Sequence, residues 1–177
     1  MLALVQLTGA PPARAETRID EVVVTNSSND LLLYFQLRNA ITLEMEQGLK
    51  SGLPLTFTFF VELHRQRNGW LDQHILSSEF NHRLNYDSLK DEYHVVREEE
   101  GETILTATSL AEANQLMTRV NGLVLLPLDQ LVTGHSYTLR VRARLAEKSR
   151  PLSFHRLLPL RRLWSFETAW HNVEFHY

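Results

Sequence analysis

The densest group of ionic side chains is a row of arginines near the C-terminal end of the chain. Arg140, Arg142 and Arg144 alternate with apolar residues in the segment YTLRVRARL. Alternate residues of a β-strand lie on one face, about 6.6 Å apart. The spacing therefore predicts a ladder of guanidinium groups along one strand. Such a ladder can bind an acidic protein, anionic lipid headgroups or the acidic segment of the same chain, and the pattern does not choose among the three.

Basic and aromatic residues continue downstream of this row. Between Arg140 and Arg162 the only acidic residue is Glu147. Leu152–Phe166 is too apolar for a solvated tail. We favour a segment that packs across one end of the domain over an exposed patch for a partner or a membrane surface. The residues that we predict for an interaction surface are Arg140, Arg142, Arg144, Arg161, Arg162 and Trp164.

The eight histidines do not have the spacing of a metal site. The chain contains no H-E-x-x-H motif and no two histidines at alternate positions of one strand. The hairpin register described below places His64 and His74 on opposite faces, and His171 and His176 are also opposite if they are extended. We therefore expect histidines at the surface or the rim, and neither a metal nor a cofactor.

The carboxylates and nucleophiles also lack a catalytic arrangement. Acidic residues are densest around Glu98–Glu102 (EEEGE). This segment lies between two predicted strands, which indicates a solvated turn instead of the cleft that acid–base catalysis needs. There is no G-x-S-x-G motif, no glycine-rich phosphate loop and no cysteine, so thiolate catalysis, disulfides and Cys-ligated zinc are excluded. We expect a protein that is not an enzyme.

The length and composition of the chain are those of one globular domain. The chain has 177 residues, of which 44% are hydrophobic and 22% are charged, and its formal net charge is −3. This charge argues against a general nucleic-acid binder, because such proteins gain affinity by neutralising phosphates. No apolar run reaches the roughly 20 residues that a transmembrane helix needs.

The N-terminal residues indicate export. Met1–Leu7 (MLALVQL) is apolar, and Ala13 and Ala15 supply the small residues of a signal-peptidase site before Glu16. No Lys or Arg precedes the apolar run. We therefore interpret residues 1–15 as a truncated signal peptide whose true start lies upstream, with a plain N-terminal tail as the alternative. Residues 16–177 would then form a single periplasmic domain.

Apolar and polar residues alternate along most of this domain, as in antiparallel strands with one buried face. Two segments have helical spacing instead: Asn39–Lys50, with Asn39 as its cap, and a helix that begins at the capping box Ser109–Glu112 and ends at Asn121-Gly122. The predicted fold is mainly β, an antiparallel β-sandwich of about seven to nine strands with two short helices. The predicted strands are Arg18–Thr25, Leu31–Leu37, Leu55–Arg65, Tyr93–Arg97, Thr103–Ala107, Ser136–Leu145 and one within Trp164–Phe175, with Leu123–Leu128 ambiguous.

One hairpin can be given a register. Asn68-Gly69 follows the most regular predicted strand and is typical of a two-residue type I′ turn, which needs positive φ at both positions. In that register Arg65 pairs with Asp72, and Phe57 pairs with Phe80. An opposite-charge pair and an aromatic pair both favour this arrangement.

Four segments, taken in order, extend over most of residues 16–177. They are SGLPLTFTFFVEL (Ser51–Leu63), LNYDSLKDEYHV (Leu84–Val95), SLAEANQLM (Ser109–Met117) and YTLRVRARL (Tyr137–Leu145), the last followed by Pro151-Leu152. Together they resemble the bacterial domain of unknown function family 4390. The resemblance implies an exported protein with no assigned activity, often encoded beside a membrane sensor histidine kinase of the nitrogen-regulation type. It implies no catalytic residues.

Two hypotheses for function follow. The first is a non-enzymatic periplasmic interaction or signalling-accessory module, whose partner is a membrane sensor kinase or another envelope protein. Contact with a membrane surface stays open. The alternative is a carrier that holds a small apolar ligand between its two sheets, in a cavity lined by Phe57, Phe59, Phe80 and Trp70. Dense packing of protein interiors favours a filled core over such a cavity.

Overall fold

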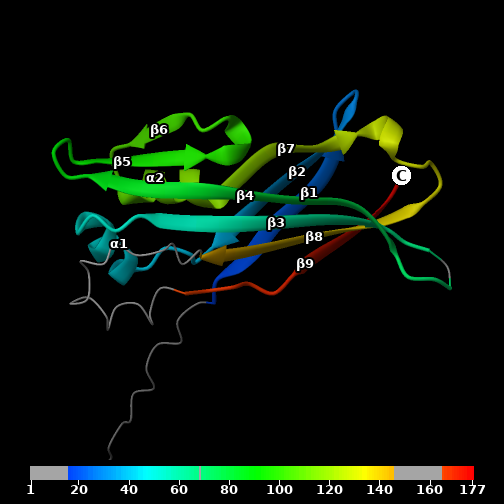
Figure 1. The fold of residues 1–177 in the computed structure, drawn as a ribbon, viewed down its shortest axis with the longest axis horizontal. Coiled ribbons are helices and arrows are strands. Elements are labelled where there is room, and N and C mark those ends of the chain that lie inside the picture. Colours follow the sequence, from blue (N-terminus) through cyan, green and yellow to red (C-terminus); the bar gives the residue numbers. More distant parts are fainter. Residues whose placement is uncertain (1–15, 68, 146–164) are drawn as a thin grey trace, which may run out of the picture.

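The computed structural model describes residues 16–67, 69–145 and 165–177, and these form two antiparallel β-sheets packed face to face (Figure 1). One sheet has the strand order β1-β2-β7, and the other has the order β6-β5-β4-β3-β8-β9. The predicted mainly-β antiparallel sandwich with two short helices is confirmed. The strands are β1 (Arg18–Asn26), β2 (Asp30–Arg38), β3 (Leu55–Arg65), β4 (Gln73–Asp87), β5 (Glu92–Arg97), β6 (Ile104–Ala107), β7 (Arg119–Pro127), β8 (Ser136–Leu145) and β9 (His171–His176). The helices are α1 (Leu43–Lys50) and α2 (Leu110–Thr118), with short 3-10 turns η1 (Glu98–Glu100) and η2 (Leu128–Gln130).

The core lies between the sheets and follows the alternation in the sequence. On β3 the side chains of Phe57, Phe59, Val61 and Leu63 are fully buried. Phe59 meets Phe35 of β2 across the sandwich, with the ring centroids 5.4 Å apart. Burying one such side chain contributes roughly 1.5–3 kcal/mol to the free energy of unfolding. The contact between β3 and β2 therefore helps to hold the two sheets together.

The hairpin formed by β3 and β4 has a different register from the predicted one. Phe59, not Phe57, pairs with Phe80, and Arg65 pairs with Gln73 instead of Asp72. The connection is longer than a two-residue turn, because β3 ends at Arg65 and β4 begins only at Gln73. Along most of the hairpin the shift is two residues, which returns each side chain to the face it was predicted to occupy. The wrong register therefore left the predicted core intact.

Both helices form, with changes at their ends. α1 begins at Leu43 and is capped by Thr42, whose Oγ1 accepts a hydrogen bond from Met45 N at 3.3 Å. The predicted cap, Asn39, lies outside the helix with φ of 56°. Its side-chain amide donates to the carbonyl oxygen of Glu16 at 3.2 Å. Asn39 therefore holds the start of the described chain instead of starting α1.

α2 begins at the predicted cap but ends earlier than predicted. Ser109 Oγ accepts a hydrogen bond from Glu112 N at 3.2 Å. The Glu112 carboxylate reaches back to Thr108 N at 3.0 Å, one residue before the cap. The helix ends at Thr118, and the pair Asn121-Gly122 lies inside β7. The signal that we assigned to a helix end belongs to an irregularity in that strand.

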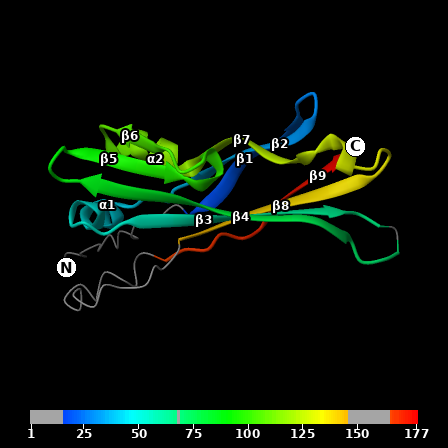
Figure 2. The same cartoon turned by 45° about the horizontal axis from the view of Figure 1, so that its top comes forward.

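Three chain segments meet at one end of the sandwich. Figures 1 and 2 both place the β3–β4 turn, the turn before β8 and the C-terminus there. Gly134 N donates to Tyr177 O at 2.6 Å, which joins two of these segments. The β4–β5 turn lies at the opposite end (Figure 1). Neither α1 nor α2 has the length and apolar composition to cross a bilayer, and the part of the chain that the structure describes contains no other α-helix.

Candidate functional site

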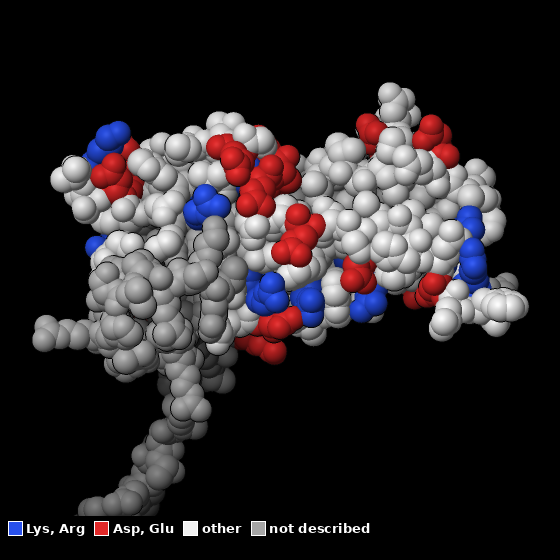
Figure 3. All heavy atoms as spheres, in the orientation of Figure 1, with Lys and Arg blue, Asp and Glu red and all other residues white. Residues whose placement is uncertain are grey.

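The predicted row of arginines lies on the outer face of the six-stranded sheet. On β8, Leu139 and Val141 are fully buried against the core, so Arg140, Arg142 and Arg144 project from the other side. We call these three residues the arginine ladder. Figure 3 shows basic side chains gathered over this part of the sheet, with acidic ones beside them. The predicted orientation of the ladder is correct.

Two aromatic rings separate the guanidinium groups of the ladder. Those of Arg140 and Arg142 each lie 4.6 Å from the centroid of the Trp170 ring. On the other side, Arg142 and Arg144 lie 4.9 and 5.0 Å from the centroid of the Phe60 ring. The five side chains thus form one alternating cation–π stack, a contact worth about 0.5–1 kcal/mol at exposed sites.

Carboxylates neutralise part of the ladder. Arg140 Nη1 lies 3.6 Å from Glu62 Oε2, and Arg142 Nη1 lies 2.5 Å from Glu167 Oε1. Arg144 is exposed and forms no ion pair within the described ranges. The interpretation that the ladder pairs with the segment Glu98–Glu102 is therefore wrong, because its acidic partners come from β3 and from the residues before β9.

The aromatic part of this surface, Phe60 and Trp170, was not predicted from the sequence. Phe60 is a large apolar residue at an outward position of β3, where the alternation of the strand predicts a polar residue. This exception to the pattern could have identified Phe60 as part of a surface site. Trp170 precedes β9, and nothing in the sequence around it indicates that its ring contacts arginines of β8. Three residues of the predicted surface, Arg161, Arg162 and Trp164, lie outside the described residues.

The acidic segment Glu98–Glu102 forms the predicted turn between β5 and β6, but only Glu100–Glu102 is exposed, and Glu98 and Glu99 are partly buried. Glu98 Oε2 accepts hydrogen bonds from the backbone and side-chain nitrogens of Asn81, both at 2.9 Å. Glu100 Oε1 lies 2.5 Å from Arg97 Nη1. The turn η1 is therefore tied to β4 and β5 by its own carboxylates.

Glu99 makes the most buried of these contacts. Its Oε1 lies 2.8 Å from His82 Nε2, and its side chain is 8% exposed. Burial by itself raises the pKa of Glu99, but the hydrogen bond from His82 and its positive charge outweigh this effect, so the pKa lies below its usual value. The carboxylate is ionised at neutral pH, and His82 is its partner.

His82 is the clearest exception to the prediction that histidines lie at the surface. Its side chain is fully buried, and its Nδ1 donates to the carbonyl oxygen of Met117 at 2.9 Å. Arg97, also buried, donates to the carbonyl oxygens of Leu116 and Arg119 at 3.0 and 2.6 Å. Cationic donors are favourable at the C-terminal end of a helix, where carbonyl groups lack partners. The hydrogen bonds of His82 and Arg97 therefore attach the end of α2 to the six-stranded sheet.

The hairpin histidines also differ from the prediction. His64 and His74 are paired residues, with ring centroids 5.3 Å apart, because the register changes by one residue between Leu63 and His64. They therefore share a face. No group of three or more His, Asp or Glu side chains that could hold a metal ion occurs among the described residues.

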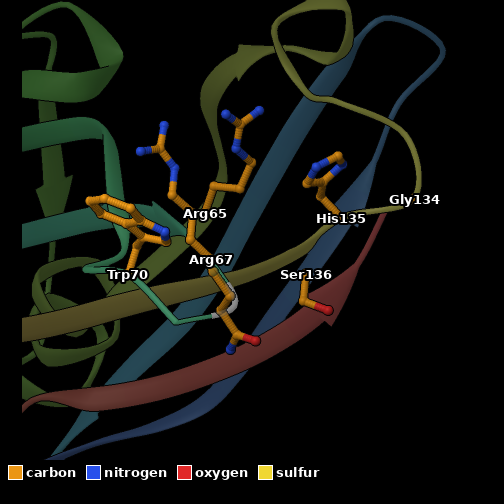
Figure 4. A pocket seen from close by; sticks show the side chains of 7 residues that line it. Arg65, Arg67, Trp70, Gly134, His135 and Ser136 are labelled. Carbon is orange, nitrogen blue, oxygen red and sulfur yellow. The ribbon is translucent and has the colours of Figure 1, made fainter.

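A hollow of about 470 Å³ opens at the end of the sandwich where the β3–β4 turn lies. Figure 4 shows the side chains of Arg65 and Arg67 between the ring of Trp70 and the imidazole of His135. Both guanidinium groups donate to the same atom, Gln73 Oε1. The remaining wall is formed by Gln66, Gly134 and Ser136.

The ring of Trp70 is 82% exposed, so it does not line a space between the sheets as the carrier hypothesis required. The other three aromatic residues of that hypothesis are buried. Phe59 stacks on Phe80 at 5.3 Å, and Phe57 meets Phe166 at 5.4 Å. These rings touch neighbouring rings, as in a filled core.

The sequence profile of a family described as "Domain of unknown function (DUF4390)" matches residues 14–174. The chain belongs to the DUF4390 family. The match extends over both sheets and both helices, so the sandwich, the arginine ladder and the hollow all belong to the DUF4390 domain. No protein of curated function matches the chain, and no solved structure matches it.

Proposed function

We propose that this DUF4390 domain is an exported, non-enzymatic interaction module that binds an acidic surface of an envelope protein through the arginine ladder. The partner that we propose first is the extracytoplasmic part of a membrane sensor kinase. The single observation that supports this best is the ordered cation–π stack on the outer face of the six-stranded sheet.

The stack is favourable for binding because it is pre-organised. A free arginine side chain loses about 0.5–1.5 kcal/mol of conformational entropy when a partner immobilises it. In the ladder each guanidinium group already lies within 5.0 Å of the centroid of the Phe60 or the Trp170 ring. Arginine and tryptophan are also the residues most enriched among those that dominate interface energies. An acidic partner would therefore meet rigid donors at a lower entropic cost.

Arg144 is the residue on which a test should concentrate. It is exposed and forms no ion pair within the described ranges, whereas Arg140 and Arg142 each have a carboxylate partner. Reversing all three charges would place new carboxylates beside Glu62 and Glu167 and would disturb the sheet. Reversing Arg144 alone keeps both paired arginines. Because the backbone of Arg144 pairs with that of Glu167 across a β-bridge, thermal unfolding should confirm that the variant keeps the fold.

The experiment compares the wild type, Arg144→Glu and Lys90→Glu in binding to the purified extracytoplasmic part of a sensor kinase encoded beside the gene. Lys90 lies in the exposed β4–β5 turn and provides the matched charge reversal. We expect Arg144→Glu to raise Kd by at least about tenfold, with Lys90→Glu unchanged. Equal affinities of all three proteins would refute the choice of surface. An undetectable wild-type interaction would refute the choice of partner.

The carrier hypothesis has no observation in its favour, because Trp70 lies outside the core and the inward aromatic rings contact one another. Native mass spectrometry of protein purified from its host tests this conclusion directly. We expect the mass of the chain alone, and a bound apolar molecule would revive the carrier.

A further inference from the structure

The tip of the β3–β4 hairpin presents large apolar side chains to solvent. Trp70 is 82% exposed and Leu71 is 92% exposed. Val132, in the turn before β8 at the same end of the molecule, is 41% exposed. Figures 1 and 2 show this hairpin turn at an extremity of the sandwich, where it can meet a flat surface without obstruction from the sheets.

The hollow next to this tip is basic, and within the described ranges neither of its arginines forms an ion pair with a carboxylate. Arg65 and Arg67 both donate to the uncharged amide oxygen of Gln73. Arg65 Nε is buried and has no hydrogen-bond partner. The acidic residue of the turn, Asp72, is exposed and accepts from neither arginine among the described contacts. Two guanidinium groups with one neutral acceptor leave donors free for an anion.

We propose that this end of the DUF4390 domain binds the surface of an anionic phospholipid membrane. The phosphate groups of the lipids occupy the basic hollow, and the side chains of Trp70 and Leu71 enter the boundary between headgroups and acyl chains. This contact is separate from the arginine ladder and does not depend on the proposed protein partner.

The order of residue types along the hairpin supports a membrane over a protein partner. Tryptophan prefers the membrane interface, where its ring is apolar on one side and its N–H is solvated. Arginine side chains near an interface place their charge at the level of the phosphates. Here the apolar residues lie at the tip, and the two arginines lie behind them on the hairpin. A protein interface would more often bury its tryptophan in a pocket, whereas this residue is 82% exposed at the rim of the basic hollow.

The test uses the chain from Glu16 onward and sedimentation with vesicles. One set of vesicles contains phosphatidylcholine alone, and the other also contains about one third phosphatidylglycerol. We expect binding to the anionic vesicles and much weaker binding to the neutral ones. Raising the salt concentration to about 0.5 M should release most of the protein, because it screens exposed charges.

Three single variants divide the contact into its parts. Arg67→Gln should weaken binding about fivefold, the effect of one basic residue at an anionic surface. Trp70→Ala and Leu71→Ser should each weaken it by about tenfold, the effect of losing one buried apolar side chain. Leu89→Ser and Lys90→Gln are matched controls in the turn at the opposite end, since Leu89 is 97% exposed. These controls should bind as the wild type does.

Several outcomes would overturn the proposal. Absence of binding to anionic vesicles at low salt is one, and unchanged binding of Trp70→Ala and Leu71→Ser is another. Binding of free glycerol phosphate without vesicle binding would assign a soluble anion to the hollow instead. Equal loss in the Leu89 and Lys90 controls would indicate an effect of overall charge and apolar area. Thermal unfolding of each variant separates all of these outcomes from a loss of the fold.

Discussion

Replacing His82 by leucine gives the sharpest test of how α2 and η1 are joined to the six-stranded sheet. The imidazole is fully buried, lies 4.8 Å from the ring centroid of Phe59 and donates to Met117 O and to Glu99. Leucine fills a similar volume, so the cavity contribution is small. What remains is a carboxylate that is 8% exposed, whose other oxygen already lacks a hydrogen-bond partner. We expect His82→Leu to lower the free energy of unfolding by about 3–5 kcal/mol, as is typical of breaking a buried charged pair.

The assay is urea-induced unfolding at pH 7, followed by circular dichroism and extrapolated to water. His74→Leu on the same strand is the control, because His74 is exposed and the change should stay within about 0.5 kcal/mol. Glu99→Gln in the His82→Leu background removes the unpaired charge and should restore at least about 1 kcal/mol. A cost below about 1 kcal/mol for His82→Leu, or no restoration by Glu99→Gln, would refute the reasoning.

The same pair predicts a dependence on pH with a defined sign. The pKa of Glu99 is lowered in the folded protein, so its contribution to stability is present above the unfolded pKa, near 4.3, and is lost as the pH falls further. In His82→Leu the two largest causes that lower this pKa are absent, and only a backbone hydrogen bond and the charge of Arg97 still oppose the effect of burial, so the pKa of Glu99 should be higher than in the wild type. The free energy of unfolding of the wild type, measured from about pH 6 down to about pH 3, should therefore fall once the pH passes below about 4.3. It should rise, or fall less, in the variant, and parallel curves would contradict the assignment.

Two further predictions concern other parts of the chain. Gly122→Ala should destabilise the fold by about 1–2 kcal/mol, because Gly122 has φ of 71° and a Cβ there would lie 3.2 Å from the hydroxyl oxygen of Tyr34. Urea unfolding should show that Tyr34→Phe restores part of this loss. If residues 1–15 are a signal peptide, N-terminal sequencing of protein from a periplasmic extract should return Glu-Thr-Arg-Ile, beginning at Glu16. Recovery from the cytoplasm with Met1 intact would contradict export.

The sequence was sufficient for the fold wherever the alternation of side chains was regular. β3 and β8 have the predicted bounds, and their apolar residues are buried as expected. The turn residues were less informative. Asn68-Gly69 predicts a two-residue turn only if the paired strands extend up to these two residues. Here they stop at Arg65 and Gln73, and local preference for a turn gives no information about where the pairing ends.

The candidate sites were harder to predict, since they depend on contacts between distant segments. The segment Glu98–Glu102 has the composition of a solvated turn. Only the position of β4 in the structure shows that Asn81 and His82 form hydrogen bonds with its carboxylates. Likewise, the ladder needs Trp170, which precedes β9 and stacks on two residues of β8. A pattern within one strand predicts the face of a side chain but not its partner on another strand.

The error in the hairpin register has a consequence for function. The predicted pairing of Arg65 with Asp72 would have neutralised this guanidinium group and closed the end of the hairpin with an ion pair. In the structure a one-residue irregularity between Leu63 and His64 brings Gln73 opposite Arg65, and the charge meets an amide oxygen instead of a carboxylate. Trp70 then lies in an open connection beside a basic hollow. The register that the pattern did not predict is therefore what leaves Arg65 without a carboxylate partner, as the proposed contact with an anionic surface requires.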